Sequence, residues 1–260
     1  MAQNMKIYSW NMLFRNRELD RAFEFIKKSD FDIFCLQEVP DEFLKRLRSL
    51  PYHLAETVDA NHLFRVPNTH RVVILSRYEI VQNKRISFPD YWSELPWRAK
   101  ALVWLLGPLG WSKRTNRAAL VADIITLKGT VRIFNLHLVL ATPEKRLREF
   151  EQALADRDRD LPTIVCGDFN TLQSPRVSLL NWLLGGRASD ALFYNRERTR
   201  IEVSFIEHQL TNALAGGITH PLSQSQLDHI LVSHSFSIKN ADVIADRFGS
   251  DHHPIKVETE

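Results

Sequence analysis

Short runs of apolar and β-branched residues alternate along the chain with segments in which apolar residues recur every three or four positions. The first pattern is typical of strands and the second of helices. The first pattern predicts strands over residues 5–10, 32–39, 71–76, 100–105, 118–126, 130–138, 162–167, 227–233, 237–243 and 255–257. Helices are predicted near 19–26, 43–50, 143–158 and 177–184, the last preceded by Ser174 and Pro175 as a capping pair. Strands joined by short connections predominate, which favours two packed sheets flanked by helices over a doubly wound parallel sheet.

The composition is that of an ordinary globular protein. The chain has 260 residues, of which 44% are hydrophobic and 25% charged, and no Gly/Ser-rich or Pro-rich linker divides it. We therefore expect a single domain over residues 1–260. Cys35 and Cys166 lie inside apolar runs, which predicts buried thiols in a reducing compartment. The first residues contain no signal-peptide pattern, and segment 101–111 is far shorter than the ~20 residues of a membrane-spanning helix, so we expect a cytoplasmic protein.

Polar residues stand at the ends of predicted apolar strands, where core packing alone would not place them. A single strand-end aspartate is usually a turn residue, but these positions recur along the whole chain. Burying so many uncompensated carboxylates would cost several kcal/mol each, so we expect them to contact one another or a metal ion. The oxygen-rich set suits Mg²⁺ or Mn²⁺. The positions are Asn11, Gln37-Glu38, Asn135 with His137, Asp168 with Asn170, Asp228-His229 and 251–254.

These polar positions form six short motifs, and their order along the chain resembles that of the endonuclease/exonuclease/phosphatase superfamily of metal-dependent phosphoesterases. The resemblance extends over residues 5–257. It implies an α/β chain of the α+β type, folded as a four-layered αββα sandwich of two packed, mainly antiparallel sheets flanked by helices. The motifs are Ser9-Trp-Asn11, Leu36-Gln-Glu38, Asn135-Leu-His137-Leu, Gly167-Asp-Phe-Asn170, Gln226-Leu-Asp228-His-Ile-Leu and Ser250-Asp-His252-His-Pro-Ile.

The same resemblance implies a role for each motif residue. It places Glu38 as the principal carboxylate on Mg²⁺ or Mn²⁺, with Asn11 and Asp251 close to the ion. His252 is then the general base or transition-state stabiliser, held in its tautomer by Asp228. Asp168 and Asn170 orient the attacking water and the scissile phosphate, and His137 contacts a phosphate oxygen. Hydrolysis of a phosphodiester needs these parts: a positioned water, a cation over the phosphoryl oxygens and help for the leaving group.

The basic residues gather in one part of the chain. Segment 62–117 contains ten lysines and arginines against three acids, together with four tryptophans, although the formal net charge of the whole chain is only +3. Basic residues interleaved with aromatic ones suit a phosphate-bearing partner, although a solvated basic face would give the same pattern. We therefore expect a nuclease or phosphodiesterase that acts on nucleic acid or nucleotides. The candidate substrate-binding residues are Asn135, Arg65, Arg71, Arg98 and Lys113.

Two other functions fit the same residues. The motif Asn135-Leu-His137-Leu, with its histidine, resembles that of the branches that include deoxyribonucleases, deadenylases, sphingomyelinases and inositol-phosphate phosphatases. The same histidine disfavours abasic-site endonucleases. A lipid or inositol-phosphate phosphoesterase is thus the alternative, with segment 104–111 as an apolar hairpin at a membrane surface. A catalytically inactive binding module is the third hypothesis, which the complete set of motif residues disfavours. Nothing in the sequence indicates an obligate protein partner.

Overall fold

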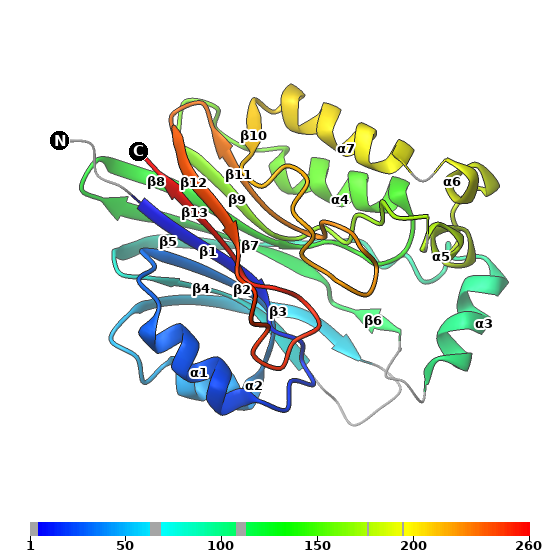
Figure 1. Cartoon of the computed structure of the whole chain (residues 1–260), viewed down its shortest axis with the longest axis horizontal. Coiled ribbons are helices and arrows are strands. Elements are labelled where there is room, and N and C mark those ends of the chain that lie inside the picture. The colour runs from blue at the N-terminus through cyan, green and yellow to red at the C-terminus, as the bar shows by residue number, and fades with distance from the viewer. Residues whose placement is uncertain (1–4, 63–68, 108–112, 176, 194) are drawn as a thin grey trace.

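Two β-sheets pack face to face, and helices cover their outer faces (Figure 1). The computed structural model describes residues 5–62, 69–107, 113–175, 177–193 and 195–260. Helices α1 (Leu19–Lys28) and α2 (Asp41–Leu47) pack on the first sheet, and α4 (Pro143–Leu154) and α7 (Asn195–Glu207) pack on the second. The predicted fold class, an α+β sandwich of two sheets between helices, is confirmed.

Each sheet contains, among its described strands, a single parallel pair near its centre. The first sheet has the order β12-β13-β1-β2-β4-β3-β6, and the second has the order β10-β11-β9-β8-β7-β5. The parallel pairs are β1 with β2 and β8 with β9, and the remaining pairs are antiparallel. The strands of the first sheet are β1 (Met5–Asn11), β2 (Ile33–Pro40), β3 (His53–His62), β4 (Thr69–Ser76), β6 (Arg114–Thr115), β12 (Ile238–Val243) and β13 (Ile255–Thr259). Those of the second are β5 (Glu79–Ser87), β7 (Ala118–Thr126), β8 (Gly129–His137), β9 (Thr163–Asp168), β10 (Leu210–Asn212) and β11 (Asp228–Ser233).

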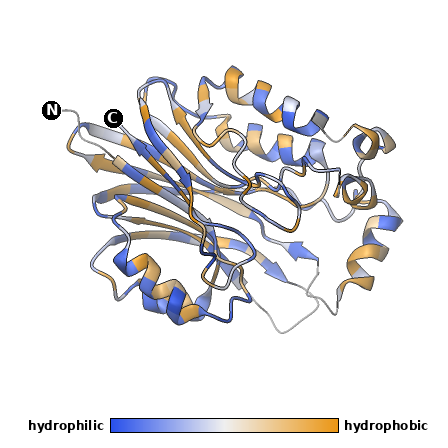
Figure 2. Cartoon of the chain, viewed as in Figure 1, coloured by the Kyte–Doolittle hydropathy of each residue, from blue (hydrophilic) through white to orange (hydrophobic). Residues whose placement is uncertain are grey.

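The core between the sheets is built from alternate residues of the central strands, because successive side chains of a strand point to opposite faces. On β1, Ile7 lies in this core, whereas Trp10 packs against the helices outside. On β8, Ile133 lies inside and Phe134 packs outside. The resulting bands of hydrophobic and hydrophilic residues run along strands and helices in Figure 2. Towards one end of the sandwich the inward positions become polar, at Asn11, Gln37, Asn135, His137 and Asp168.

One predicted strand is wrong, because residues 100–105 lie in helix α3 (Trp97–Leu105). A short continuous apolar run does not distinguish a strand from a helix, and this run consists mainly of helix-forming residues. Its flank supplies the helix start, since Pro96 is the N-cap residue. Within α3 only Ala99 is buried, so the apolar run does not join either sheet.

The capping pair at Ser174 and Pro175 is also wrong. The helix there is α5 (Ser178–Leu183), its N-cap residue is Val177, and α6 (Ala188–Leu192) follows it. Several other elements were not predicted: β3, the two-residue β6, the three-residue β10, α6, α7, and the edge strand β5, which is mostly exposed and lacks a hydrophobic pattern.

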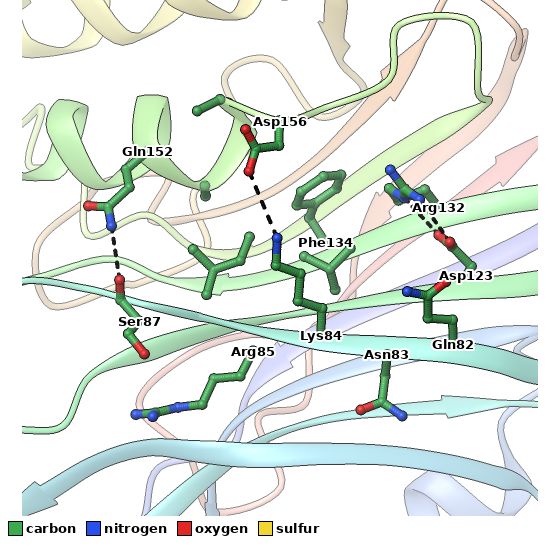
Figure 3. A pocket seen from close by; sticks show the side chains of 14 residues that line it. Gln82, Asn83, Lys84, Arg85, Ser87, Asp123, Arg132, Phe134, Gln152 and Asp156 are labelled. Carbon is green, nitrogen blue, oxygen red and sulfur yellow. Dashed lines mark hydrogen bonds and ion pairs between the residues drawn. The ribbon is translucent and has the colours of Figure 1, made fainter.

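A hollow of about 540 Å³ lies between β5, β7, β8 and the end of α4 (Figure 3). Lys84 and Asp156 approach to 3.8 Å across it, and Arg132 donates two hydrogen bonds to Asp123 at 2.7 and 2.8 Å. The residues that line it include none of the polar strand-end residues. The hollow is therefore separate from the candidate site. Within the described ranges, no helix combines the length and the apolar character needed to cross a membrane.

Candidate active site

The C-terminal ends of the two parallel strand pairs face each other across the sandwich. Strands β1 and β2 bring Asn11 and Glu38 to this edge from the first sheet, and β8 and β9 bring His137 and Asp168 from the second. Asn11 Nδ2 donates to Asp168 Oδ2 at 2.9 Å, which joins the two sheets. Asp228 begins β11 directly opposite Asp168. The fold therefore brings polar ends of five strands together.

Asp168 is the central carboxylate of this edge. It is buried, and its second oxygen accepts the backbone N–H of Asn170 at 2.8 Å. Nε2 of His137 and Nε2 of His252 both lie 3.8 Å from Asp168 Oδ2, on two sides of it. Burial raises the pKa of Asp168, and the neighbouring Asp228 carboxylate adds to the effect, whereas the two imidazoles and Asn11 oppose it. Asp168 is thus a strong hydrogen-bond acceptor between two imidazoles.

His252 is held by Asp228. Its Nδ1 lies 2.8 Å from Asp228 Oδ2, and because a carboxylate accepts, Nδ1 carries the hydrogen and Nε2 faces Asp168. Ser250 Oγ donates to the carbonyl oxygen of Asn11 at 2.7 Å, which ties the loop before β13 to the end of β1. Burial opposes protonation, but Asp228 and Asp168 outweigh it and raise the pKa of His252 to about 10. The raised pKa favours the protonated ring, which would donate a hydrogen bond from Nε2.

His137 is held by a carboxylate that the sequence pattern did not indicate. Its Nδ1 lies 2.6 Å from Asp59 Oδ2 on β3. Burial alone would lower the pKa of His137, but Asp59 outweighs it and raises the pKa. The same Asp59 oxygen lies 3.1 Å from Nε2 of His70, whose Nδ1 is 3.2 Å from Nε2 of His62. Two imidazoles, those of His137 and His70, therefore contact one buried carboxylate, and His62 contacts the second of them.

A β-bulge aims Glu38 into the site. Alternation along β2 would turn Glu38 towards the helices, but the pairing with β4 shifts between Leu36 and Val39, and Glu38 has φ 54°. Its Oε1 consequently lies 3.7 Å from Nε2 of His137 and accepts a hydrogen bond from Arg114 Nη2 at 3.0 Å. Burial would raise the pKa of Glu38, but the Arg114 charge and neighbouring histidines lower it to about 2. Glu38 is therefore ionised at every pH in ordinary use.

Arg114 is a further residue of the site that sequence reasoning missed. It lies on β6, a strand of two residues, which is too short to show any periodicity. Its Nη1 is 3.5 Å from Nε2 of His137, so the guanidinium is placed between Glu38 and that ring. Its presence in the basic segment 62–117 was the only available signal.

Comparison with known proteins agrees with this arrangement. A family model described as the endonuclease/exonuclease/phosphatase family matches residues 8–252. The chain belongs to the endonuclease/exonuclease/phosphatase family. Members of this family are phosphoesterases, so the resemblance seen in the motifs is confirmed.

Solved structures of low sequence identity share the fold of this family member. An endonuclease/exonuclease/phosphatase structure from Beutenbergia cavernae is 16% identical, with a TM-score of 0.72 over 100% of this chain and 72% of that chain. A mannosyl-6-phosphatase from Bacteroides thetaiotaomicron is 19% identical, with a TM-score of 0.64 over 98% and 99% of the two chains. The 2′,3′-cyclic phosphatase ANGEL2, solved with adenosine-2′,3′-vanadate, is 16% identical, with a TM-score of 0.63 over 98% and 95%. No curated protein sequence matches the chain.

The donor atoms of this family member fit a hard divalent cation. Glu38 and Asp168 are buried carboxylates, and buried Oδ1 atoms of Asp228 and Asp251 have no hydrogen-bond partner within the described residues. Unpaired buried oxygen atoms are costly unless a cation or water satisfies them. Asn11 is already engaged, since its Oδ1 accepts the backbone N–H of Leu13. Three groups of histidines and carboxylates have ligand atoms within 4.8 Å of one another: Glu38-His70-His137, Asp168-Asp228-His252 and His220-Asp251-His252.

Asn135, a candidate substrate-binding residue in the sequence, lies between the two sheets. It is fully buried, and its Nδ2 donates to the carbonyl oxygens of Leu36 and Val73 at 3.0 and 2.9 Å. Its Oδ1 accepts from Gln37 Nε2 at 2.7 Å. Both the nitrogen and the oxygen of the Asn135 amide are thus hydrogen-bonded within the protein. This placement supports a role in positioning the two sheets, without contact with substrate. Asn170 is likewise engaged, because its Nδ2 donates to the Leu138 carbonyl oxygen at 2.9 Å.

The basic residues predicted to bind substrate make contacts within the protein wherever the structure describes them. These contacts occupy the charged groups of the side chains, whereas a groove that binds a polyanion would leave those groups free for the phosphates of its ligand. Arg65 lies outside the described residues, as do residues 108–111 of the segment predicted as a membrane hairpin. The contacts are those of Arg71 with Asp41 at 2.6 Å, of Lys113 with Asp90 at 3.3 Å, and of Arg98 with the carbonyl oxygens of Trp182 and Gly186 at 3.0 and 2.8 Å.

Proposed function

We propose that this chain hydrolyses a phosphoester of nucleotide size with the help of Mg²⁺ or Mn²⁺. One observation carries the proposal: Asp168 stands between two imidazoles, and each imidazole is fixed by its own carboxylate, Asp228 or Asp59. In a histidine–carboxylate pair, the carboxylate fixes which nitrogen of the imidazole carries the proton. Phosphoryl transfer needs proton donors and acceptors that are fixed in this way.

Each residue has a proposed part in the reaction. The protonated Nε2 of His252 donates to a phosphoryl oxygen and stabilises the negative charge of the transition state. Asp168 Oδ2 accepts the proton of the attacking water as the water oxygen bonds to phosphorus, and the bond to the leaving oxygen breaks, with that oxygen taking a proton from solvent. Asn11 and the backbone N–H of Asn170 hold the Asp168 carboxylate. His137 and Arg114 bind further phosphoryl oxygens from the opposite side. Glu38 would hold the cation with Asp251 near it, and Asn11 would lie beside it without binding it, because both atoms of its amide are used by Leu13 and Asp168. The positive charge of the cation would lower the barrier by neutralising the phosphoryl oxygens.

The internal contacts of the basic residues support a small substrate. A long nucleic acid needs several exposed cations along its backbone, whereas Arg71, Arg98 and Lys113 are engaged within the protein. Arg114 is a cation inside the site itself. We therefore favour a nucleotide or a short oligonucleotide over an extended strand.

A lipid phosphoester is the second candidate, because helix α3 exposes large apolar side chains. Trp97 and Trp104 are 80% and 83% exposed, and Leu105 is 66% exposed. Tryptophan at this level of exposure is typical of membrane-interface segments.

A substrate panel tests both candidates. The purified chain is assayed with Mg²⁺ or Mn²⁺ on 2′,3′-cyclic and 5′-nucleotides, oligonucleotides, a sugar phosphate and sphingomyelin vesicles. We expect turnover of nucleotides that disappears in a His252→Ala variant, measured per folded molecule. Turnover only on vesicles would replace the first candidate by the second. Absence of turnover on every phosphoester would support an inactive binding module.

A further inference from the structure

His220 lies beside the candidate site, in the loop between β10 and β11, and no motif includes it. Its ring centroid is 4.8 Å from that of His252, and its Nε2 is 3.8 Å from Asp251 Oδ2. The side chain is 13% exposed, so the ring is largely fixed while one edge remains accessible. The loop itself is held by a bridge between His220 and Ser225.

The tautomer of His220 follows from its neighbours. The backbone N–H of Ser223 lies 3.2 Å from Nδ1, and the Ser223 hydroxyl lies 2.8 Å from the same atom. A backbone N–H can only donate, so Nδ1 of His220 accepts and carries no hydrogen. The hydrogen of the neutral ring is therefore on Nε2. Asp251 at 3.8 Å is too far away to take this hydrogen in a hydrogen bond.

This tautomer argues against a metal ion bound by His220. His220, Asp251 and His252 bring ligand atoms within 4.8 Å of one another, as a metal site would. A metal-bound imidazole nitrogen needs a free lone pair, however, and Nε2 of His220 uses its position for a hydrogen. Coordination through Nε2 would require the other tautomer, whose Nδ1–H would face the backbone N–H of Ser223. The edge of the ring therefore offers a hydrogen-bond donor.

We propose that Nε2–H of His220 binds a phosphoryl oxygen of the substrate, next to the oxygen bound by His252. This inference rests on the proposed function. The site residues form a continuous row in which neighbouring groups are 3.0 to 3.8 Å apart, with a ring contact at its end. His220 closes the end opposite Arg114, so the phosphate is bound from both sides of Asp168. The row is Arg114, Glu38, His137, Asp168, His252 and His220.

Two substitutions of equal length isolate the donor. Glutamine places an amide nitrogen as many bonds from the backbone as Nε2, so His220→Gln keeps an N–H there. His220→Met has a similar length and volume but no donor. His208 is an equally exposed histidine that contacts Glu151 away from the site, so His208→Met is the matched control. The probe is inorganic phosphate, with its Kd measured by calorimetry in the presence of Mg²⁺, beside the melting temperature.

We expect His220→Met to weaken phosphate binding about 10-fold or more, as for loss of a hydrogen bond to a charged group. His220→Gln should stay within about 3-fold of the unsubstituted protein, and His208→Met should be unchanged. Equal phosphate affinity in His220→Met and the unsubstituted protein would overturn the inference, as would an equal loss in His220→Gln and His220→Met. If the unsubstituted protein neither binds phosphate nor turns over any phosphoester, the proposed function itself fails, which is a distinguishable result.

Discussion

Asp228 accepts the Nδ1 hydrogen of His252 at 2.8 Å and thereby leaves Nε2 of this ring directed at Asp168, 3.8 Å away. The contact predicts the kinetics of three single variants and one double variant. His252→Ala and Asp168→Asn should each lower kcat by about 10²–10⁴-fold, because each removes a positioned group from the reacting phosphate. Asp228→Asn should lower kcat by destabilising the imidazolium. The double variant His252→Ala/Asp228→Asn should be little slower than His252→Ala alone.

Melting temperatures measured on the same four proteins separate catalysis from stability. A purely structural role for these buried residues would lower the melting temperature and leave kcat per folded molecule unchanged. A kcat near that of the unsubstituted protein in His252→Ala would contradict the proposed mechanism whatever the substrate.

The raised pKa of His252 predicts a pH-dependent stability of the metal-free protein. The pKa is about 10 in the folded chain and 6.5 for an ordinary histidine, so the folded state binds the extra proton between these values. The stabilisation is fully present below about pH 6.5 and is lost as pH rises towards 10. Chemical denaturation in EDTA at pH 6, 8 and 9.5 measures this loss. In Asp228→Asn the loss should shrink, because the charge that raises the pKa is gone; an unchanged slope would contradict the assignment.

The buried carboxylates predict dependence on a divalent cation. EDTA should abolish turnover, and Mg²⁺ or Mn²⁺ should restore it. Glu38→Gln keeps the shape of the side chain but removes its charge, so it should weaken metal binding by calorimetry at least 10-fold. Glu56 lies on β3 and forms ion pairs with Arg71 and Arg48. Glu56→Gln removes this charge away from the site, so it is the control and should bind metal normally. Full activity in EDTA would exclude the proposed cation.

Gly167 is predicted to be intolerant of any side chain. It pairs with Leu136 in the parallel ladder of β8 and β9 and has φ +140°, and an added Cβ would lie 1.8 Å from the Leu136 carbonyl oxygen. Gly167→Ala should lower the free energy of unfolding by more than about 3 kcal/mol, or prevent folding. Gly129→Ala also has a positive φ but meets no atom within 4 Å, so it should cost only about 1–2 kcal/mol. Similar losses in urea denaturation would contradict the steric account.

The basic residues are predicted to divide into one that binds substrate and others that stabilise the fold. Arg114→Gln should raise KM for a nucleotide, because the guanidinium adjoins the site. Arg98→Gln should lower the melting temperature and leave KM unchanged, since Arg98 links α3 to the carbonyl oxygens of Trp182 and Gly186. The salt dependence of KM, measured on both variants, should be less steep only in Arg114→Gln. If Arg98→Gln instead raised KM and made its salt dependence less steep, while Arg114→Gln did not, the result would support the polyanion groove expected from the charge distribution.

The sequence predicted the sandwich and the motif residues because both depend on the same local alternation. Apolar inward positions end in polar ones at Asn11, His137 and Asp168, which is visible without any knowledge of pairing. Asp59 and His70 were missed because β3 mixes polar and apolar residues and because β4 begins three residues before its apolar run. Contacts such as that of Arg114 with Glu38 join residues distant in the sequence, and periodicity carries no information about them.

The hydrogen bond from Gln37 to Asn135 connects the two sheets one residue before Glu38 and two residues before His137. A buried amide pair, rather than a loop, therefore fixes how the two halves of the chemical centre align. Arg114 and His220, by contrast, come from a two-residue strand and a loop at the periphery. Exchange of these peripheral segments would alter which phosphoester is accepted while leaving the aligned centre intact, so reactivity and selectivity are separable properties in this architecture.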